Sequence, residues 1–130
     1  MPTTLTQGAT YGDVAKWVVN DDFNIETVTL LAGTVYSPGH VIGKITASGK
    51  YCLSPHESTT GKDGAETATA IVLFSVDATS GDRTSPVLFR GPALISASAL
   101  LYDESVDDAN KRATKRTQLA NVGLVSRTTA

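Results

Sequence analysis

The chain has 130 residues and a formal net charge of −2; apolar residues make up 41% of it and aromatic residues only 6%. This length suits one domain, with a core built mainly from Val, Leu, Ile and Ala. The slightly acidic charge disfavours proteins that bind nucleic acid through its phosphates, and the single cysteine excludes an intrachain disulfide and any multi-cysteine metal site.

The first 22 residues form a region of their own. Residues 1–13 carry Thr, Gln and Gly with few apolar side chains, so they cannot support a packed segment alone. They lack the basic and then apolar pattern of a signal peptide, and no apolar run in the chain approaches the roughly 20 residues of a membrane span. We therefore expect a soluble protein that folds in a reducing compartment.

A short apolar patch, VAKWVV at residues 14–19, contains the only tryptophan, Trp17. One interpretation is an edge strand whose aromatic ring covers the domain. The other is an arm that becomes ordered on a partner surface, since tryptophan is enriched among interface anchors. The residues themselves leave both interpretations open.

From residue 23 onward the pattern predicts short strands. Residues 23–31 (FNIETVTLL) have the two-residue period of a half-buried strand. Two short β-like runs then flank Ser37-Pro38-Gly39, which suits a type II turn because Pro38 fixes φ and Gly39 accepts a positive φ. We expect a hairpin at this turn, then a short strand at residues 50–53 and a polar loop at residues 54–66.

The second half of the chain continues in the same way. Residues 69–76 (TAIVLFSV) are a continuous apolar run, which suits a strand buried on both faces. Residues 77–83 turn the chain, and residues 85–91 are the next predicted strand. Residues 93–102 (ALISASALLY) alternate well enough to be one more strand.

The stretch that follows predicts a charged helix. Ser105 is suited to cap it, Asp107 and Asp108 would lie in its first turn, and basic residues come after them, as the helix dipole favours. Asp107 with Lys111, and Asp108 with Arg112, are acid-before-base pairs at i,i+4.

The same helix carries little apolar surface. Val106, Ala109 and Ala113 make a narrow apolar stripe, so we expect a helix on the surface of the domain. Residues 121–123 (NVG) are a plausible stop, and residues 123–126 (GLVS) predict a final strand.

The candidates for catalysis or metal binding are weak. Cys52 would need His40 or His56 as a base, but it lies in a predicted strand, where a lone cysteine is usually a small buried hydrophobe. A zinc site made from the same three residues would lack a fourth protein ligand. We therefore expect no catalytic residue, no metal and no cofactor.

Two further clusters have a plain structural interpretation. The Gly-Lys pair in residues 59–64 (TTGKDG) lacks the upstream glycine and the Ser or Thr of a phosphate-binding loop, which leaves a surface turn. The basic residues of the helix suggest phosphate contact, but four acids between residues 103 and 108 offset them. A solvated, self-neutralised helix face is therefore the expectation for Lys111, Arg112, Lys115 and Arg116.

Three stretches in order carry a family resemblance: residues 64–82 (GAETATAIVLFSVDATSGD), residues 85–103 (SPVLFRGPALISASALLYD) and residues 102–126 (YDESVDDANKRATKRTQLANVGLVS). They resemble the head decoration proteins of tailed bacteriophages, the family of the phage lambda capsid-stabilising protein. The resemblance covers roughly residues 26–127.

This resemblance implies a mainly β, compact β-clip-like domain, an incomplete barrel, with one short C-terminal surface helix and an extended N-terminal arm. Residues 1–22 would be the partly flexible arm that contacts the capsid, and residues 23–130 the β-rich decoration domain. The apolar patch around Trp17 is stronger than a purely disordered arm needs, so we expect packing from about Val14 onward.

The implied function is that of a structural virion protein without enzymatic activity. It would be made in the host cytoplasm and bind the outer surface of the expanded head at three-fold positions, as a homotrimer that stabilises the shell against DNA pressure. Its partners would be itself and the major capsid protein, with no nucleic acid and no membrane. The expected capsid-contacting residues are Thr3, Thr4, Leu5, Thr6, Tyr11, Val14 and Trp17.

Two other functions stay open at this point. A carbohydrate- or receptor-binding surface module would need an exposed aromatic platform, for which Tyr36, Tyr51 and Tyr102 are candidates beside the three phenylalanines. A small β-clip enzyme would need an ordered carboxylate that faces a pocket.

Overall fold

The computed structural model describes residues 15–18 and 24–127, and only the backbone of residues 16–18. Short strands dominate these residues, with one α-helix and one short 3-10 helix. In chain order the elements are β1 (Ala15–Val18), β2 (Ile25–Leu30), β3 (Val35–Tyr36), β4 (Val41–Lys44), β5 (Tyr51–Leu53), β6 (Ala68–Val72), β7 (Val76–Asp77), β8 (Arg83–Leu88), β9 (Ala93–Ser96), η1 (Ala97–Ala99), α3 (Ala109–Asn121) and β10 (Leu124–Arg127).

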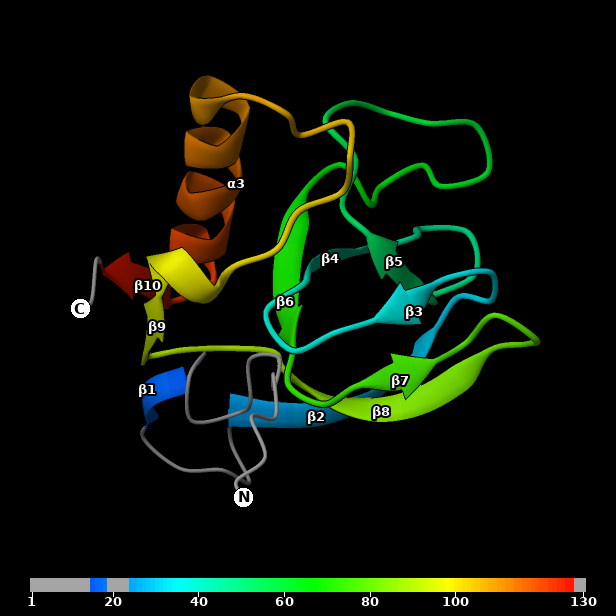
Figure 1. The fold of residues 1–130 in the computed structure, drawn as a ribbon, viewed down its shortest axis with the longest axis horizontal. Helices are drawn as coiled ribbons and strands as arrows, with labels where there is room; N and C mark the ends of the chain where they lie inside the picture. The colour runs from blue at the N-terminus through cyan, green and yellow to red at the C-terminus, as the bar shows by residue number, and fades with distance from the viewer. Residues whose placement is uncertain (1–14, 19–23, 128–130) are drawn as a thin grey trace, which may run out of the picture.

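Five of the strands form a small closed barrel in the order β2-β5-β4-β6-β8 (Figure 1). Its interior is filled by aliphatic side chains together with Tyr36, which is fully buried and donates from its hydroxyl group to the carbonyl oxygen of Leu31 at 2.8 Å. The expectation of a mainly β fold with one short C-terminal helix is therefore confirmed, and the barrel closes.

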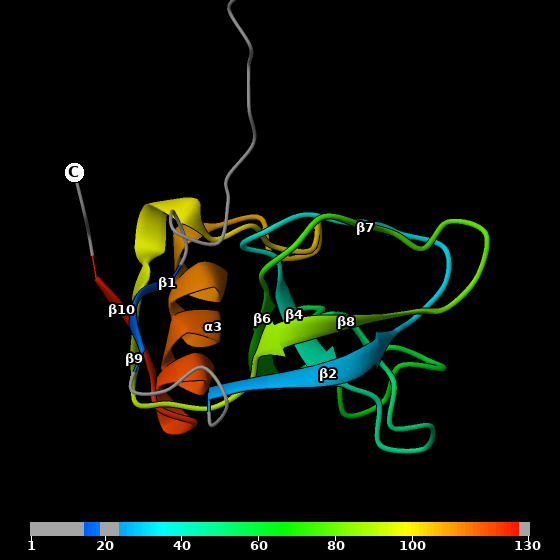
Figure 2. The same ribbon diagram turned by 90° about the horizontal axis from the view of Figure 1, so that it is seen from below.

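A second, three-stranded sheet has β9 at its centre, antiparallel to β1 on one side and parallel to β10 on the other. Helix α3 lies between this sheet and the barrel (Figure 2). One apolar cluster joins all three, because Leu119 of α3 packs with Leu124 and Ile95 of the sheet and with Ile71 and Leu88 of the barrel. The predicted final strand is thus confirmed as β10.

The Pro-Gly turn forms as predicted, but the hairpin does not. Gly39 has φ +99°, and the backbone N–H of His40 donates to the carbonyl oxygen of Ser37 at 3.1 Å. However, β3 pairs with β7, whereas β4 pairs with β5 and β6. The turn therefore leads the chain from one sheet to another. The hairpin prediction is wrong because Pro38 and Gly39 determine the turn but not which strands pair with each other.

The imidazole of His40 closes the same turn and makes it sensitive to pH. Its Nδ1 accepts a hydrogen bond from the backbone N–H of Ser37 at 2.8 Å, which requires the neutral ring, and burial lowers the pKa of His40 below its ordinary 6.5. The unfolded chain therefore binds more protons than the folded one between that lowered pKa and 6.5, so stability falls as the pH drops through this window.

We expect the free energy of unfolding to decrease from about pH 7 to about pH 5, and to decrease less in a His40→Asn variant, whose amide oxygen accepts the same hydrogen bond without titrating. Urea unfolding at several pH values measures this difference. An equal pH slope for the two proteins would contradict the role given to His40.

Two predicted strands are shorter than expected. The apolar run at residues 69–76 leaves the barrel after Val72, and Phe74 is 46% exposed instead of buried. The run at residues 93–102 ends as a strand at Ser96 and continues as the 3-10 helix η1. In both cases an apolar sequence extends beyond the length of strand that has a neighbour to pair with.

Helix α3 begins later than predicted. Its N-cap is Asp108, whose carboxylate accepts from the backbone N–H of Lys111 at 2.8 Å, so Ser105 lies outside the helix. The predicted stop is right, since the helix ends at Asn121 and Gly123 follows with φ +87°. The predicted apolar stripe is wrong, because Ala109 and Ala113 are exposed and the buried residues of the helix are Lys115 and Leu119.

Candidate functional site

Most of the predicted contact residues, namely Thr3, Thr4, Leu5, Thr6, Tyr11 and Val14, lie outside the described residues. Trp17 belongs to β1, where its backbone is in register with Leu94 of β9. The structure thus does not test these residues as contacts, but it places the strand that follows them.

That strand, β1, is an edge strand of the three-stranded sheet. Ala15 is in register with Ile95, Val18 is in register with Ala93, and the side chain of Ala15 is packed in the apolar core. The backbone of residues 15–18 is therefore an edge strand, as the first of the two interpretations expects, while the ring of Trp17 lies outside the described side chains. Any segment that precedes Ala15 is attached to the body through backbone pairing with β9.

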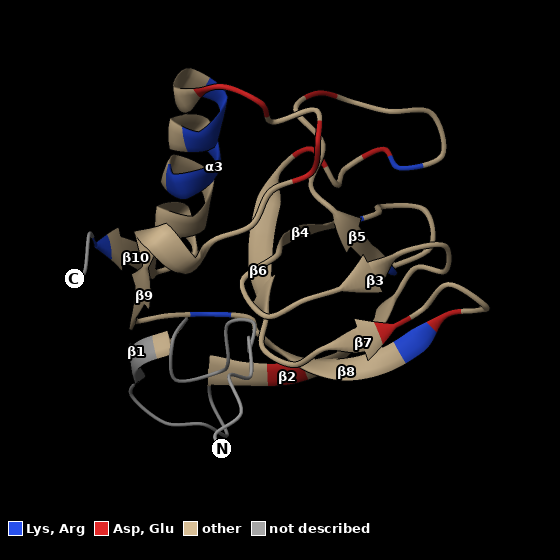
Figure 3. Ribbon diagram, viewed as in Figure 1, with Lys and Arg blue, Asp and Glu red and all other residues tan. Residues whose placement is uncertain are grey.

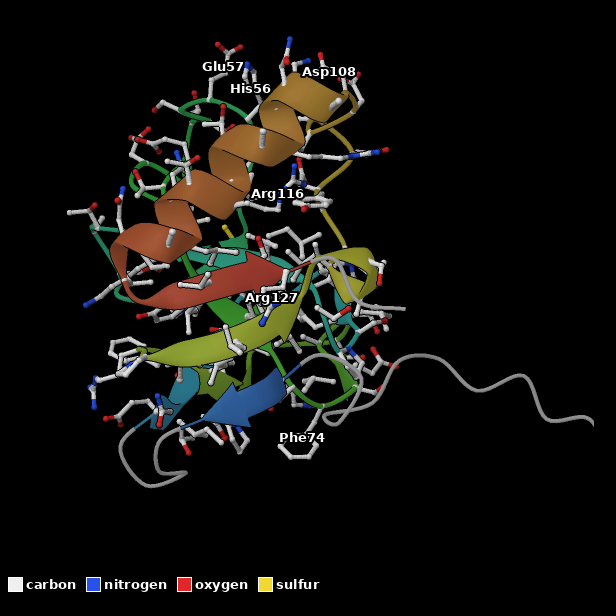
Figure 4. All side chains as sticks on the ribbon, turned by 90° about the vertical axis from the view of Figure 1, so that its left-hand side faces the viewer. His56, Glu57, Phe74, Asp108, Arg116 and Arg127 are labelled. Carbon is white, nitrogen blue, oxygen red and sulfur yellow. The ribbon has the colours of Figure 1, made fainter. Side chains whose placement is uncertain are left out.

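The two ends of the described chain flank β9 on one side of the molecule. Figure 4 shows β1, β9 and β10 side by side, with Arg127 at the far end of β10. Leu124 points into the core and is fully buried, whereas Val125, the next residue, is 45% exposed. This side therefore combines both chain ends with one exposed aliphatic side chain.

Lys115 is the most unusual side chain of the structure. It is 1% exposed, and its Nζ donates to three oxygens: Ser54 Oγ at 2.9 Å, the Pro55 carbonyl at 2.6 Å and the Glu66 carbonyl at 2.6 Å. Burial lowers the pKa of Lys115, while the three acceptors use all three donors of the ammonium group. The expectation that Lys115 is solvated is wrong: it fastens α3 to both ends of the loop at residues 54–66.

The other three basic residues of α3 make intramolecular contacts. Lys111 Nζ lies 2.9 Å from Asp107 Oδ1, which confirms one predicted ion pair. The other predicted pair is wrong, because Asp108 caps the helix and the guanidinium of Arg112 lies 5.8 Å from the ring centroid of Tyr102. Arg116, labelled in Figure 4, donates to the Tyr102 hydroxyl group at 3.3 Å.

A cleft of about 530 Å³ lies beside these residues, between α3 and residues 97–107. Asp103, Glu104 and Asp107 line it together with Arg112 and Arg116. Figure 3 shows the acidic segment before α3 close to the basic face of the helix. Because both signs of charge meet here, the cleft does not present the positive surface that phosphate binding needs.

Cys52 and the histidines occupy separate places. Cys52 is 2% exposed and packs with Ile45 and Ala65, and burial raises the pKa of its thiol. His40 is held in its turn, and His56 is an exposed loop residue whose backbone N–H donates to Ser105 Oγ at 2.9 Å. Within the described part of the chain, no three His, Cys, Asp or Glu side chains gather as they would around a metal ion.

The remaining sequence candidates are structural. Residues 59–62 form a turn in which the backbone N–H of Lys62 donates to the carbonyl oxygen of Thr59 at 2.8 Å. Tyr36 and Tyr51 are buried, at 0% and 5% exposure, so they offer no platform for a sugar ring. No helix in the described ranges has the length and apolar content to cross a bilayer.

Comparison with known proteins gives one finding. A family model described as "Bacteriophage lambda head decoration protein D" matches residues 4–124. A search of curated proteins finds no match.

Proposed function

Because the chain belongs to the bacteriophage lambda head decoration protein D family, we propose that it binds the outside of an expanded phage head as a homotrimer at three-fold positions and stabilises the shell. The single observation that carries this proposal is the extent of the family match, which begins at residue 4 and so includes nearly all of the N-terminal arm. The family is one of phage head proteins, and the proposed role requires no catalysis and no cofactor.

The N-terminal arm is the proposed contact, and β1 is its attachment to the body. Residues 3–6 and Tyr11 precede Ala15, whose strand pairs with β9 and is held in the core. An extended arm that continues from this edge adds a strand to an exposed edge of the shell protein, and main-chain hydrogen bonds supply the affinity. The major capsid protein is therefore the proposed partner.

Three arms acting together overcome the weakness of one. Ordering a dozen residues costs about 1–2 kcal/mol each for the backbone, so the net affinity of a single arm is low. In a trimer the second and third attachments are intramolecular, which raises the overall affinity by about 10²–10⁴-fold. Each trimer then ties neighbouring shell subunits together against the pressure of packaged DNA.

Two measurements test this function. Light scattering in solution should give three times the mass of one chain. The protein should also co-sediment with expanded, undecorated heads and raise the temperature at which the capsids are disrupted. A monomer that stays in the supernatant would contradict the proposal.

The two other functions have weaker support. The buried rings of Tyr36 and Tyr51 weaken the case for a carbohydrate- or receptor-binding module. Carboxylates line the mixed-charge cleft beside α3, but its arginines are already engaged with Tyr102.

A further inference from the structure

Strand β2 is paired along its whole length on one side and almost unpaired on the other. All six of its residues are in register with β8, from Ile25 with Leu88 to Leu30 with Arg83. On its other side, among the described residues, β2 meets β5 in register only at its end, where Leu30 pairs with Tyr51. Within residues 24–127 the barrel therefore closes at one point, and no strand of this range pairs with the first part of this β2 edge.

The pattern of hydrogen bonds shows which backbone groups face this opening. The N–H of Phe89 donates to the carbonyl oxygen of Asn24 at 2.8 Å, which makes this a bonded pair in the antiparallel ladder. Bonded and non-bonded pairs alternate, so Glu26 and Val28 bond to β8, whereas Thr27 does not. The N–H and C=O of Thr27 consequently face away from β8, toward the opening.

The opening is a groove and not a gap filled by side chains. It has a volume of about 410 Å³ and is lined by Glu26, Thr27, Val28, Thr29, Lys44, Gly49, Tyr51, Phe89 and Arg90. A second pocket of about 410 Å³ shares Lys44, Tyr51, Phe89 and Arg90 with it and adds Thr69 and Val122. The open edge of β2 therefore runs beside a recess large enough for a side chain.

The recess has aromatic and polar parts. Tyr51 and Phe89 meet edge to face with ring centroids 6.5 Å apart, and the guanidinium of Arg90 lies 4.9 Å from the Phe89 centroid. Thr69 lines the second pocket, and its hydroxyl oxygen is the one buried side-chain polar atom of the described residues without a hydrogen bond. A ligand in this recess meets a mainly apolar surface, with the Thr69 hydroxyl oxygen buried beneath it.

Charge at the groove favours an acidic ligand. Arg90 already contacts Glu26, with Nη2 3.1 Å from Oε1. Lys44 is exposed and has no ion pair within the described part of the chain, so it is the cation left to a ligand. Residues 1–12, the leading part of the arm, contain no Asp or Glu, so this part of a neighbouring copy's arm lacks the carboxylate that would match Lys44.

We propose that this groove receives an extended segment of the shell protein, which pairs with β2 at Thr27, inserts an apolar side chain between Tyr51, Phe89 and Val122, and places a carboxylate on Lys44. The outward N–H and C=O groups along the edge of β2 are best matched by another backbone. A peptide strand therefore fits here better than a small molecule. This inference rests on the proposed function and adds a second contact, separate from the N-terminal arm.

Two groove variants and one control test it. Lys44→Glu reverses the charge at an exposed position. Thr27→Pro removes the outward N–H group of residue 27, and an edge strand accepts proline at a position whose N–H does not bond to the neighbouring strand. Lys62→Glu makes the same charge change in the loop at residues 54–66, away from both pockets. Affinity for expanded, undecorated heads is measured by co-sedimentation, together with the midpoint of thermal unfolding and the mass in solution.

We expect Lys44→Glu and Thr27→Pro each to weaken binding by about tenfold or more, and Lys62→Glu to change it by less than about twofold. If Thr27→Pro unfolds, Lys44→Glu decides alone. If the wild-type protein does not bind heads, the proposed function is wrong. If wild type and Lys44→Glu bind heads equally well, only the proposal that the groove is a binding site is overturned. A lower mass in solution for Lys44→Glu would make the occupant a second copy of this chain and would also overturn the assignment.

Discussion

Replacing Lys115 by Met lowers the free energy of unfolding by about 3 kcal/mol. Met keeps most of the packing of the lysine stem but removes the ammonium group, so Ser54 Oγ and the carbonyl oxygens of Pro55 and Glu66 lose a donor at 2.6–2.9 Å. Each buried acceptor without a partner costs about 1–3 kcal/mol, and the desolvation of the lysine, which the substitution relieves, offsets part of the sum.

Urea unfolding measures this effect, with Lys111→Met as the matched control on the same helix. Lys111 makes a surface ion pair with Asp107 that solvent and salt screen, so its loss should hardly move the transition. A Lys115→Met protein as stable as the control would show that the three hydrogen bonds do not fasten the helix to the loop.

Deleting residues 1–13 abolishes head binding while the body stays folded. The truncated chain keeps β1, whose backbone pairing with β9 and buried Ala15 belong to the core. It loses the proposed shell-contacting arm, and with three arms gone the affinity falls by at least about 10²-fold. Co-sedimentation with expanded heads measures the loss, and circular dichroism with light scattering checks that fold and oligomeric mass are unchanged.

The control for this deletion removes residues 128–130, which follow β10 in the sequence. This shorter chain should bind heads like the full one. Undiminished binding by the chain that lacks residues 1–13 would refute the arm as the main contact and leave the groove beside β2 as the remaining candidate.

The features that the sequence predicts correctly are those set by neighbours in the chain. Pro38 and Gly39 dictate a turn wherever it lies, Asp107 meets Lys111 because the two lie four residues apart across the N-cap of α3, and Gly123 accepts the positive φ that ends the helix. None of these depends on what packs against the segment.

The features that it misses depend on distant partners. The hairpin at Pro38-Gly39 fails because β7 and β6 arrive from far along the chain to pair with β3 and β4. Lys115 is buried because the ends of the 54–66 loop supply its acceptors. One signal was present: Leu119 is the only large apolar residue of α3, and Lys115, one turn before it, shares its face.

The candidate contacts divide in the same way. Composition distinguishes the N-terminal arm from the body, but the described residues begin at Ala15, so the structure adds the anchoring strand and not the contacts themselves. The groove beside β2 carries no sequence signal, since the residues that line it come from four separate stretches of chain. They come together where β2 and β5, among the described residues, pair in register only at Leu30 and Tyr51.

A reconstruction of expanded heads decorated with this protein, by electron cryomicroscopy, tests the central claim most directly. We expect density for three copies around each three-fold position on the outer surface, with residues 1–14 continuous along an edge of the shell protein. Heads that carry no such density after saturation, or density in which the N-terminal segment points away from the shell, would contradict it.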